Sequence, residues 1–321
     1  MDSPSSEQSS FIYRPPINFL IYSALLPLTL FVWYTPWWPL VGVCWLATAH
    51  FGHTIVLALH EGAHYHLHPV RWMNELRGVS IGVGTLTPFT VYRELHQYHH
   101  SALSTIKDKE LWPYNDPHAP RWLRILAAWG ELLLGIVVTP AIYVYGFCQL
   151  DVAPEVRRRA YGELLLMAAT WSGILAVIHH FDWWIPFVVA WLVPAVLTGS
   201  LQAARKFTEH LGLLANGPLS ASRTILHAKP LGWLMSRTML NIGHHGTHHR
   251  YGKLPYYEIP AATPKAYGPD YDQGPVFSSY WSAFCDMLPA LLNPRVGAQW
   301  CNKPAVSSDA SDAELVSAQP G

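Results

Sequence analysis

Long apolar stretches with few charged residues dominate the hydrophobic pattern of the chain. A bilayer core of about 30 Å is crossed by a helix of about 20 apolar residues. Stretches close to this length occupy residues 17–34, 38–59, 76–91, 123–147, 164–178 and 184–204. The pattern predicts an all-α integral membrane protein with transmembrane helices.

Charge and proline positions reduce the expected number of crossings to four. The basic run 157–159 marks a cytoplasmic loop before a span at 161–179, because short cytoplasmic loops are rich in Lys and Arg. Pro140 should break a helix within 123–147, which suits an interfacial or re-entrant hairpin. The expected crossings are 17–34, 38–59, 161–179 and 184–204, with both termini in the cytoplasm; hydropathy alone also permits six.

Composition agrees with a membrane protein and argues against nucleic-acid binding. Only 13% of the residues are charged and the formal net charge is zero, whereas soluble domains have roughly 25% charged residues. The 15 Trp and 16 Tyr fit aromatic belts at the membrane surface. We expect a polar segment at 1–16 without signal-peptide features, one membrane domain over 17–300 with a possible amphipathic helix at 276–292, and a disordered tail at 301–321.

Histidines concentrate in three short blocks beside apolar segments: HEGAH at 60–64, HQYHH at 96–100 and HHGTHH at 244–249. On a helix, residues three or four apart lie on one face, so each block can present two imidazoles to one metal. In the second block this pair is His96 and His99, and His100 points in an adjacent direction, where a second metal could bind it; the third block repeats this geometry. A further histidine follows the last apolar stretch in RKFTEHLG. The candidate metal ligands are His60, His64, His96, His99, His100, His210, His245, His248 and His249.

Nine imidazoles are too many for one zinc ion, which in structural sites takes four ligands. Two metal ions are therefore expected. Imidazole does not identify the metal, but a site at a membrane surface suits hydrophobic substrates with unactivated C–H bonds. Such bonds need a redox metal and dioxygen, which favours iron.

Other histidines have simpler interpretations. A lone histidine in an apolar helix is usually a hydrogen-bonded core residue. We expect this of His50, His53, His179 and His180.

The order of these blocks, HxxxH, HxxHH and HxxHH, resembles that of the membrane-bound fatty acid desaturase superfamily, which includes desaturases, hydroxylases and carotenoid-modifying enzymes. The resemblance covers about residues 60–260. Its motifs are HEGAHYHLHPVRWMNELRG, YRELHQYHHSALSTIKDKE, KFTEHLG and NIGHHGTHHRYGKLPYY.

The resemblance implies an oxygen-dependent enzyme with two closely spaced iron ions held by the nine histidines. It also implies roles at the site for Glu61, which would orient an imidazole N–H, and for Asn241, which would bind metal through water. Asp108 and Glu110 either orient imidazoles or are solvated charges. No HPGG motif of a fused cytochrome b5 is present, so the electron donor would be a separate protein such as ferredoxin, rubredoxin or cytochrome b5.

Several functions remain open from the sequence. The leading one is a desaturase that introduces a double bond into a fatty acyl or other lipid chain, and a di-iron hydroxylase of a lipid, alkane or carotenoid is the main alternative. HEGAH also matches the HExxH motif of zinc proteases, and clustered histidines could line the path of a metal transporter. The site is expected on the cytoplasmic face of a bacterial inner membrane or the endoplasmic reticulum.

Overall fold

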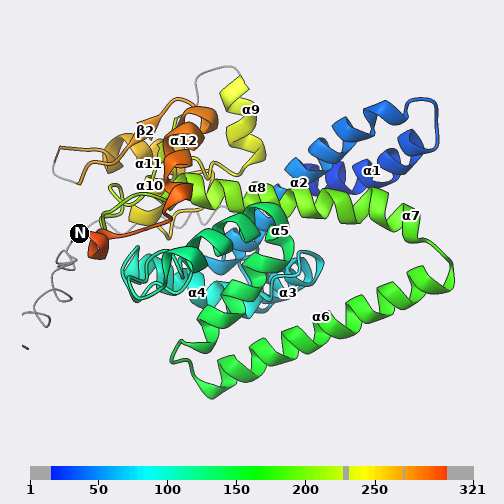
Figure 1. Cartoon of the computed structure of the whole chain (residues 1–321), viewed down its shortest axis with the longest axis horizontal. Coiled ribbons are helices and arrows are strands. Elements are labelled where there is room, and N and C mark those ends of the chain that lie inside the picture. Colours follow the sequence, from blue (N-terminus) through cyan, green and yellow to red (C-terminus); the bar gives the residue numbers. More distant parts are fainter. Residues whose placement is uncertain (1–15, 227–230, 270–271, 302–321) are drawn as a thin grey trace, which may run out of the picture.

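The chain folds mainly into helices, as the hydrophobic pattern predicts (Figure 1). The computed structural model describes residues 16–226, 231–269 and 272–301; the expected polar segment and tail fall almost entirely outside them. The longer helices are α1 (Pro16–Trp33), α2 (Val41–Ala63), α3 (Arg71–Gly84), α4 (Phe89–Ala102), α5 (Arg121–Cys148), α6 (Pro154–His180) and α8 (Val193–His210).

Shorter elements complete the fold. They are η1 (Trp38–Leu40), α7 (Trp184–Phe187), η2 (Val188–Leu192), β1 (Thr224–Ile225), α9 (Leu231–Thr238), α10 (His245–Arg250), α11 (Ile259–Ala266), β2 (Val276–Phe277), α12 (Tyr280–Met287), η3 (Leu288–Leu292) and η4 (Ala298–Trp300). Strands β1 and β2 form a short parallel pair. Helix α12 lies in the segment expected to be amphipathic, and the Ser279 hydroxyl accepts from the Ser282 N–H at its start.

Four helices are long and apolar enough to cross a membrane: Trp38–Ala63, Arg121–Cys148, Pro154–His180 and Trp184–His210. The number agrees with the expected four, but the membership differs. Ile17–Trp33 is apolar but shorter, and Arg121–Cys148 qualifies although its segment was not expected to cross.

A helix break was expected at Pro140, but Pro140 lies inside α5. The helix is instead interrupted earlier, at Leu134 (φ −133°, ψ 35°), where two helical segments meet at a kink. The ring of Pro140 crowds the carbonyl four residues before it, that of Ile136, so the irregular backbone at Leu134 lies outside its direct reach.

Helices α5 and α8 are held together by a close backbone approach and by buried polar bonds. A Cβ on Gly135 or Gly199 would clash with the backbone of the opposite helix, so only glycine allows this spacing, as in membrane helix pairs. Nearby, Lys206 forms a buried ion pair with Glu131. Tyr114 and Thr139 each donate to the Glu131 carboxylate over 2.7 Å.

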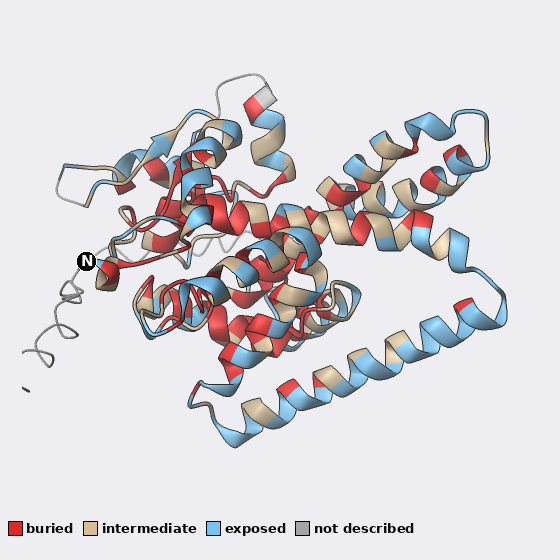
Figure 2. Ribbon diagram, in the orientation of Figure 1, coloured by how far each residue is buried: buried red, intermediate tan, exposed pale blue. Residues whose placement is uncertain are grey.

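Helix α6 contacts α3 and α4 over part of its length and is otherwise mostly exposed (Figure 2). Leu165, Leu166 and Val177 are among its exposed apolar residues. A water-soluble protein rarely exposes such a surface, but lipid would cover it. By contrast, the buried residues gather where α2, α4, α5 and α8 meet the C-terminal segments (Figure 2).

Candidate metal centre

The histidine blocks all lie at or near the ends of helices. His60 is in the last turn of α2, with His64 directly after it, and His210 is the last residue of α8. The second block occupies the C-terminal half of α4, and the third forms α10. Helix packing thus brings together imidazoles that are far apart in the sequence.

The nine candidate histidines converge into two neighbouring groups. His60, His64, His96, His100 and His248 form the five-histidine position, whose ligand atoms lie within 4.8 Å of one another. His99, His210 and His249 form a second cluster, and Glu209, His210 and His245 form a third that shares His210 with it; in each, the ligand atoms lie within 4.8 Å of one another. We call the four histidines of these two clusters the four-histidine position. All nine predicted ligands are therefore placed together, although their binding of metal stays a prediction.

In the five-histidine position the Nε2 atoms point at one another. The Nε2 atoms of His60 and His248 are 3.1 Å apart, and those of His64 and His96 are 3.0 Å apart. His100 Nε2 lies 3.1 Å from His96 Nε2 and 3.0 Å from His248 Nε2.

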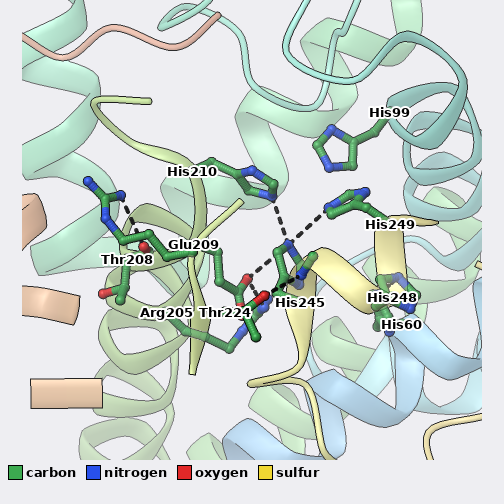
Figure 3. A network of polar contacts seen from close by, with 12 residues as sticks. His60, His99, Arg205, Thr208, Glu209, His210, Thr224, His245, His248 and His249 are labelled. Atoms are coloured by element: carbon green, nitrogen blue, oxygen red, sulfur yellow. Dashed lines mark hydrogen bonds and ion pairs between the residues drawn. The ribbon is translucent and has the colours of Figure 1, made fainter. Parts of the chain in front are cut away.

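The four-histidine position is built in the same way (Figure 3). His245 Nε2 is 2.8 Å from His210 Nε2 and 3.0 Å from His249 Nε2. The ring of His99 faces His210 and His249, with ring centres 5.1 Å and 4.8 Å away.

The Nδ1 atoms, on the side of each ring away from the converging Nε2 atoms, show why these histidine groups suit a metal. His96 Nδ1 lies 2.9 Å from Glu110 Oε2, His99 Nδ1 lies 2.7 Å from Asp108 Oδ2, and His210 Nδ1 lies 3.0 Å from a backbone carbonyl. These oxygens accept hydrogen bonds, so in the neutral imidazole each Nδ1 carries the proton and each Nε2 offers a lone pair. Lone pairs that converge in a buried site need a cation between them, and the residues present therefore fit a pair of metal ions.

Asp108 and Glu110 are buried and bonded, which settles the two interpretations of these carboxylates. Asp108 Oδ2 also accepts from Ser104 N over 3.0 Å, and Asp108 Oδ1 accepts from Glu110 N over 3.2 Å. Both residues orient imidazoles and neither is a solvated loop charge.

Glu61 lies beside the site as expected, with its carboxylate 3.4 Å from His60 Nδ1 and 3.2 Å from His66 Nδ1. Asn241 is engaged elsewhere: its amide donates to Tyr256 O over 2.9 Å and accepts from Ser236 Oγ over 2.9 Å. These bonds indicate that Asn241 shapes the segment before α10, and its role toward metal stays a prediction.

The electrostatics of the site favour neutral imidazoles with one exception. Burial, followed by the neighbouring His60, lowers the pKa of His64 to about 3. Burial also lowers the pKa of His96, His248 and His249 well below the usual value. For His99 burial acts in the same direction, but the charges of Asp108 and Glu110 outweigh it and raise the pKa to about 9.

The isolated histidines divide between core and surface. His53 is buried, and His50 is partly buried with its Nε2 2.9 Å from Thr238 Oγ1. His179 and His180 are exposed at the end of α6, so their assignment to the core was wrong. Apolar neighbours in the sequence do not show that a helix face is covered, because the C-terminal half of α6 is mostly exposed.

Glu209 and Arg205 also belong to the site and were missed from the sequence. Glu209 directly precedes His210, its carboxylate lies 3.5 Å from His245 Nε2, and Arg205 forms an ion pair with it. The available signal was the occurrence of charged residues at the end of an apolar span, where they are costly unless paired.

A cavity of about 390 Å³ adjoins the metal centre between α1, α2, α3, α5 and α8. Its lining is mainly apolar and includes Leu59, Ala195 and Trp191. Tyr92 lines the cavity and stacks on His96 with ring centres 5.4 Å apart. The cavity therefore reaches the edge of the five-histidine position.

These features define a helical membrane-protein fold with a buried, histidine-rich centre suited to metal. Residues 35–281 match the family model described as fatty acid desaturase, and the chain belongs to this family. A comparison with curated proteins finds no significant match. The family supports a lipid-modifying oxidoreductase of the desaturase or hydroxylase type.

Proposed function

We propose that the protein is an oxygen-dependent di-iron desaturase that introduces a double bond into a fatty acyl or other lipid chain. The observation that carries this proposal is the convergence of nine imidazoles, seven of them buried, beside an apolar cavity that adjoins helices long enough to cross a membrane. Bound iron would supply dioxygen activation and hydrogen removal from unactivated C–H bonds, which side chains cannot perform.

The chain's own residues bind and position the substrate. A hydrocarbon chain in the cavity would contact apolar walls such as Leu59 and Ala195, which exclude water and stabilise it by apolar burial. Tyr92 and Tyr143 both line this cavity, with ring centres 5.7 Å apart, and Tyr92 also stacks on His96. Rigid aromatic side chains at this place would fix which methylene lies nearest the histidines.

The metal ligands are positioned by groups around them. Asp108, Glu110 and the Ala221 carbonyl hold three imidazoles with Nε2 toward the centre. Such outer contacts fix the tautomer and raise ligand basicity. We infer that His60, His64, His96, His100 and His248 hold one iron, and that His99, His210, His245 and His249 hold the other.

The test is expression of the full chain with a compatible reductase and electron donor, followed by mass spectrometry of extracted lipids. Desaturation removes two hydrogens from a product lipid, whereas hydroxylation adds one oxygen atom. A zinc protease would need neither oxygen nor reductant, and a transporter would show metal flux in proteoliposomes. Iron-loaded, reducible protein that changes no lipid in any donor system would contradict the desaturase proposal.

We also propose that the histidine centre faces the cytoplasm, where a separate electron donor would reach it. Cys285 on α12 is exposed on the segment that covers α8. In a bacterial host, a variant that keeps Cys285 alone should react with a membrane-impermeant thiol reagent in inverted vesicles. Labelling in intact spheroplasts instead would contradict this orientation.

A further inference from the structure

The two metal positions are unequal in their histidine ligands. One has five imidazoles, whereas the other has four. A carboxylate also lies at the smaller position: Glu209, His210 and His245 offer ligand atoms that lie within 4.8 Å of one another. Two histidines and one carboxylate are a ligand set typical of non-haem iron.

Glu209 is placed and oriented by its surroundings on α8. Its carboxylate Oε2 lies 3.5 Å from His245 Nε2, the same nitrogen that faces His210 and His249. Figure 3 shows the carboxylate directed toward His245 from the same helix that carries His210. Arg205, one turn earlier, forms an ion pair with Oε2.

The second carboxylate oxygen has no partner. Glu209 is 1% exposed, and its Oε1 is a buried atom without a hydrogen bond in the structure. A buried acceptor left unpaired costs about 1–3 kcal/mol, and more when it is charged. A cation in the adjacent four-histidine position would remove this cost.

We propose that the Glu209 carboxylate is the fifth ligand of the metal in the four-histidine position. This inference rests on the proposed di-metal centre and adds to it a chemical difference between the two metals. One metal has only neutral imidazole ligands, whereas the other has an anionic oxygen ligand that offsets part of its charge. Arg205 is a positioning residue, because it acts on the metal through the carboxylate that it holds.

A purely structural role makes a different prediction. If Glu209 served only as the ion-pair partner of Arg205, its replacement would weaken α8 but leave the metal environment unchanged. Glu131 provides the matched control. It lies on α5, is buried like Glu209, and forms an ion pair with Lys206 of α8, the helix that carries Glu209. It belongs to neither histidine group among the described residues.

The experiment compares full-length wild type, Glu209→Gln and Glu131→Gln, purified in detergent and loaded with isotopically enriched ferrous iron without substrate. Iron content is measured, and Mössbauer spectroscopy separates the two iron environments. Wild type and Glu131→Gln should hold two irons with two distinct signals. Glu209→Gln should lose affinity for one iron by at least about tenfold, with the other signal unchanged.

Each outcome decides between the proposals. Two irons with wild-type spectra in Glu209→Gln would overturn the ligand role of Glu209 and leave the di-iron function intact. Wild-type protein that binds no iron would overturn the proposed function and this inference with it. If Glu209→Gln does not fold, Glu209→Asp is used instead. The proposal expects a change in only one of its two Mössbauer signals, and an unchanged spectrum would refute it.

Discussion

Replacement of Asp108 by asparagine should weaken metal binding at the four-histidine position without disturbing the fold. Asp108 is fully buried and accepts three hydrogen bonds, from His99 Nδ1 over 2.7 Å and from the N–H groups of Ser104 and Glu110. Asparagine has nearly the same shape but turns one acceptor into a donor. In either amide orientation, an NH₂ group then faces at least one N–H donor.

The magnitude follows from the bond that is lost. A hydrogen bond to a charged group contributes about 1.5–3 kcal/mol. Loss of a carboxylate that orients a metal-binding imidazole typically lowers metal affinity by about 10–100-fold. At about 1.4 kcal/mol for each tenfold change, the two figures agree.

The assay is anaerobic titration of the metal-free full chain with ferrous iron against a chelator of known affinity. Asp116→Asn is the matched control, because Asp116 lies in the same loop region but accepts from His118 N and not from a predicted metal ligand. Circular dichroism checks that both variants keep their helices. If Asp108→Asn binds both irons as tightly as wild type, the role of Asp108 in orienting His99 is refuted.

Three further predictions concern pH, packing and the cavity. Because the pKa of His99 is raised to about 9, the metal-free protein is stabilised by this proton below about pH 6.5 and loses that stability as pH rises through 9. A metal ion must displace the same proton from His99, so the metal affinity of the four-histidine position should rise about tenfold per pH unit between pH 7 and 8. A metal affinity that does not change with pH in chelator competition would contradict this. Gly199→Ala should lower the free energy of unfolding in detergent by about 1–3 kcal/mol, because the new Cβ meets the backbone of Ile136. Gly162→Ala is the control and should not destabilise the protein, because the space around its Cβ is open. Ala195→Leu narrows the cavity and should shift the products toward shorter chains by lipid mass spectrometry; unchanged chain lengths would show that the substrate lies elsewhere.

The sequence predicted the helical membrane class and the nine histidines that converge, because both depend on local patterns. Apolar length reports on membrane spans directly, and imidazoles three or four residues apart share a helix face whatever the fold around them. The family match over residues 35–281 confirms the resemblance that the histidine blocks indicated. Local patterns misplaced the interruption of α5, which falls at Leu134 and not at Pro140, and they misassigned His179 and His180, which are exposed at the end of α6.

Only the tertiary structure decided how the ligands are shared and what surrounds them. Spacing separates His100 from His99 correctly but pairs His96 with His99, whereas the structure groups His96 with His100 and places His99 in the other position, which depends on the helix end that each ring meets. Spacing also cannot distinguish Asp108, buried against an imidazole, from a solvated loop charge, or single out Glu209 from other acidic residues. Periodicity is set by bonds within one helix, whereas coordination is set by the packing of α2, α4, α8 and α10 against one another, and that packing arises only when the whole chain folds.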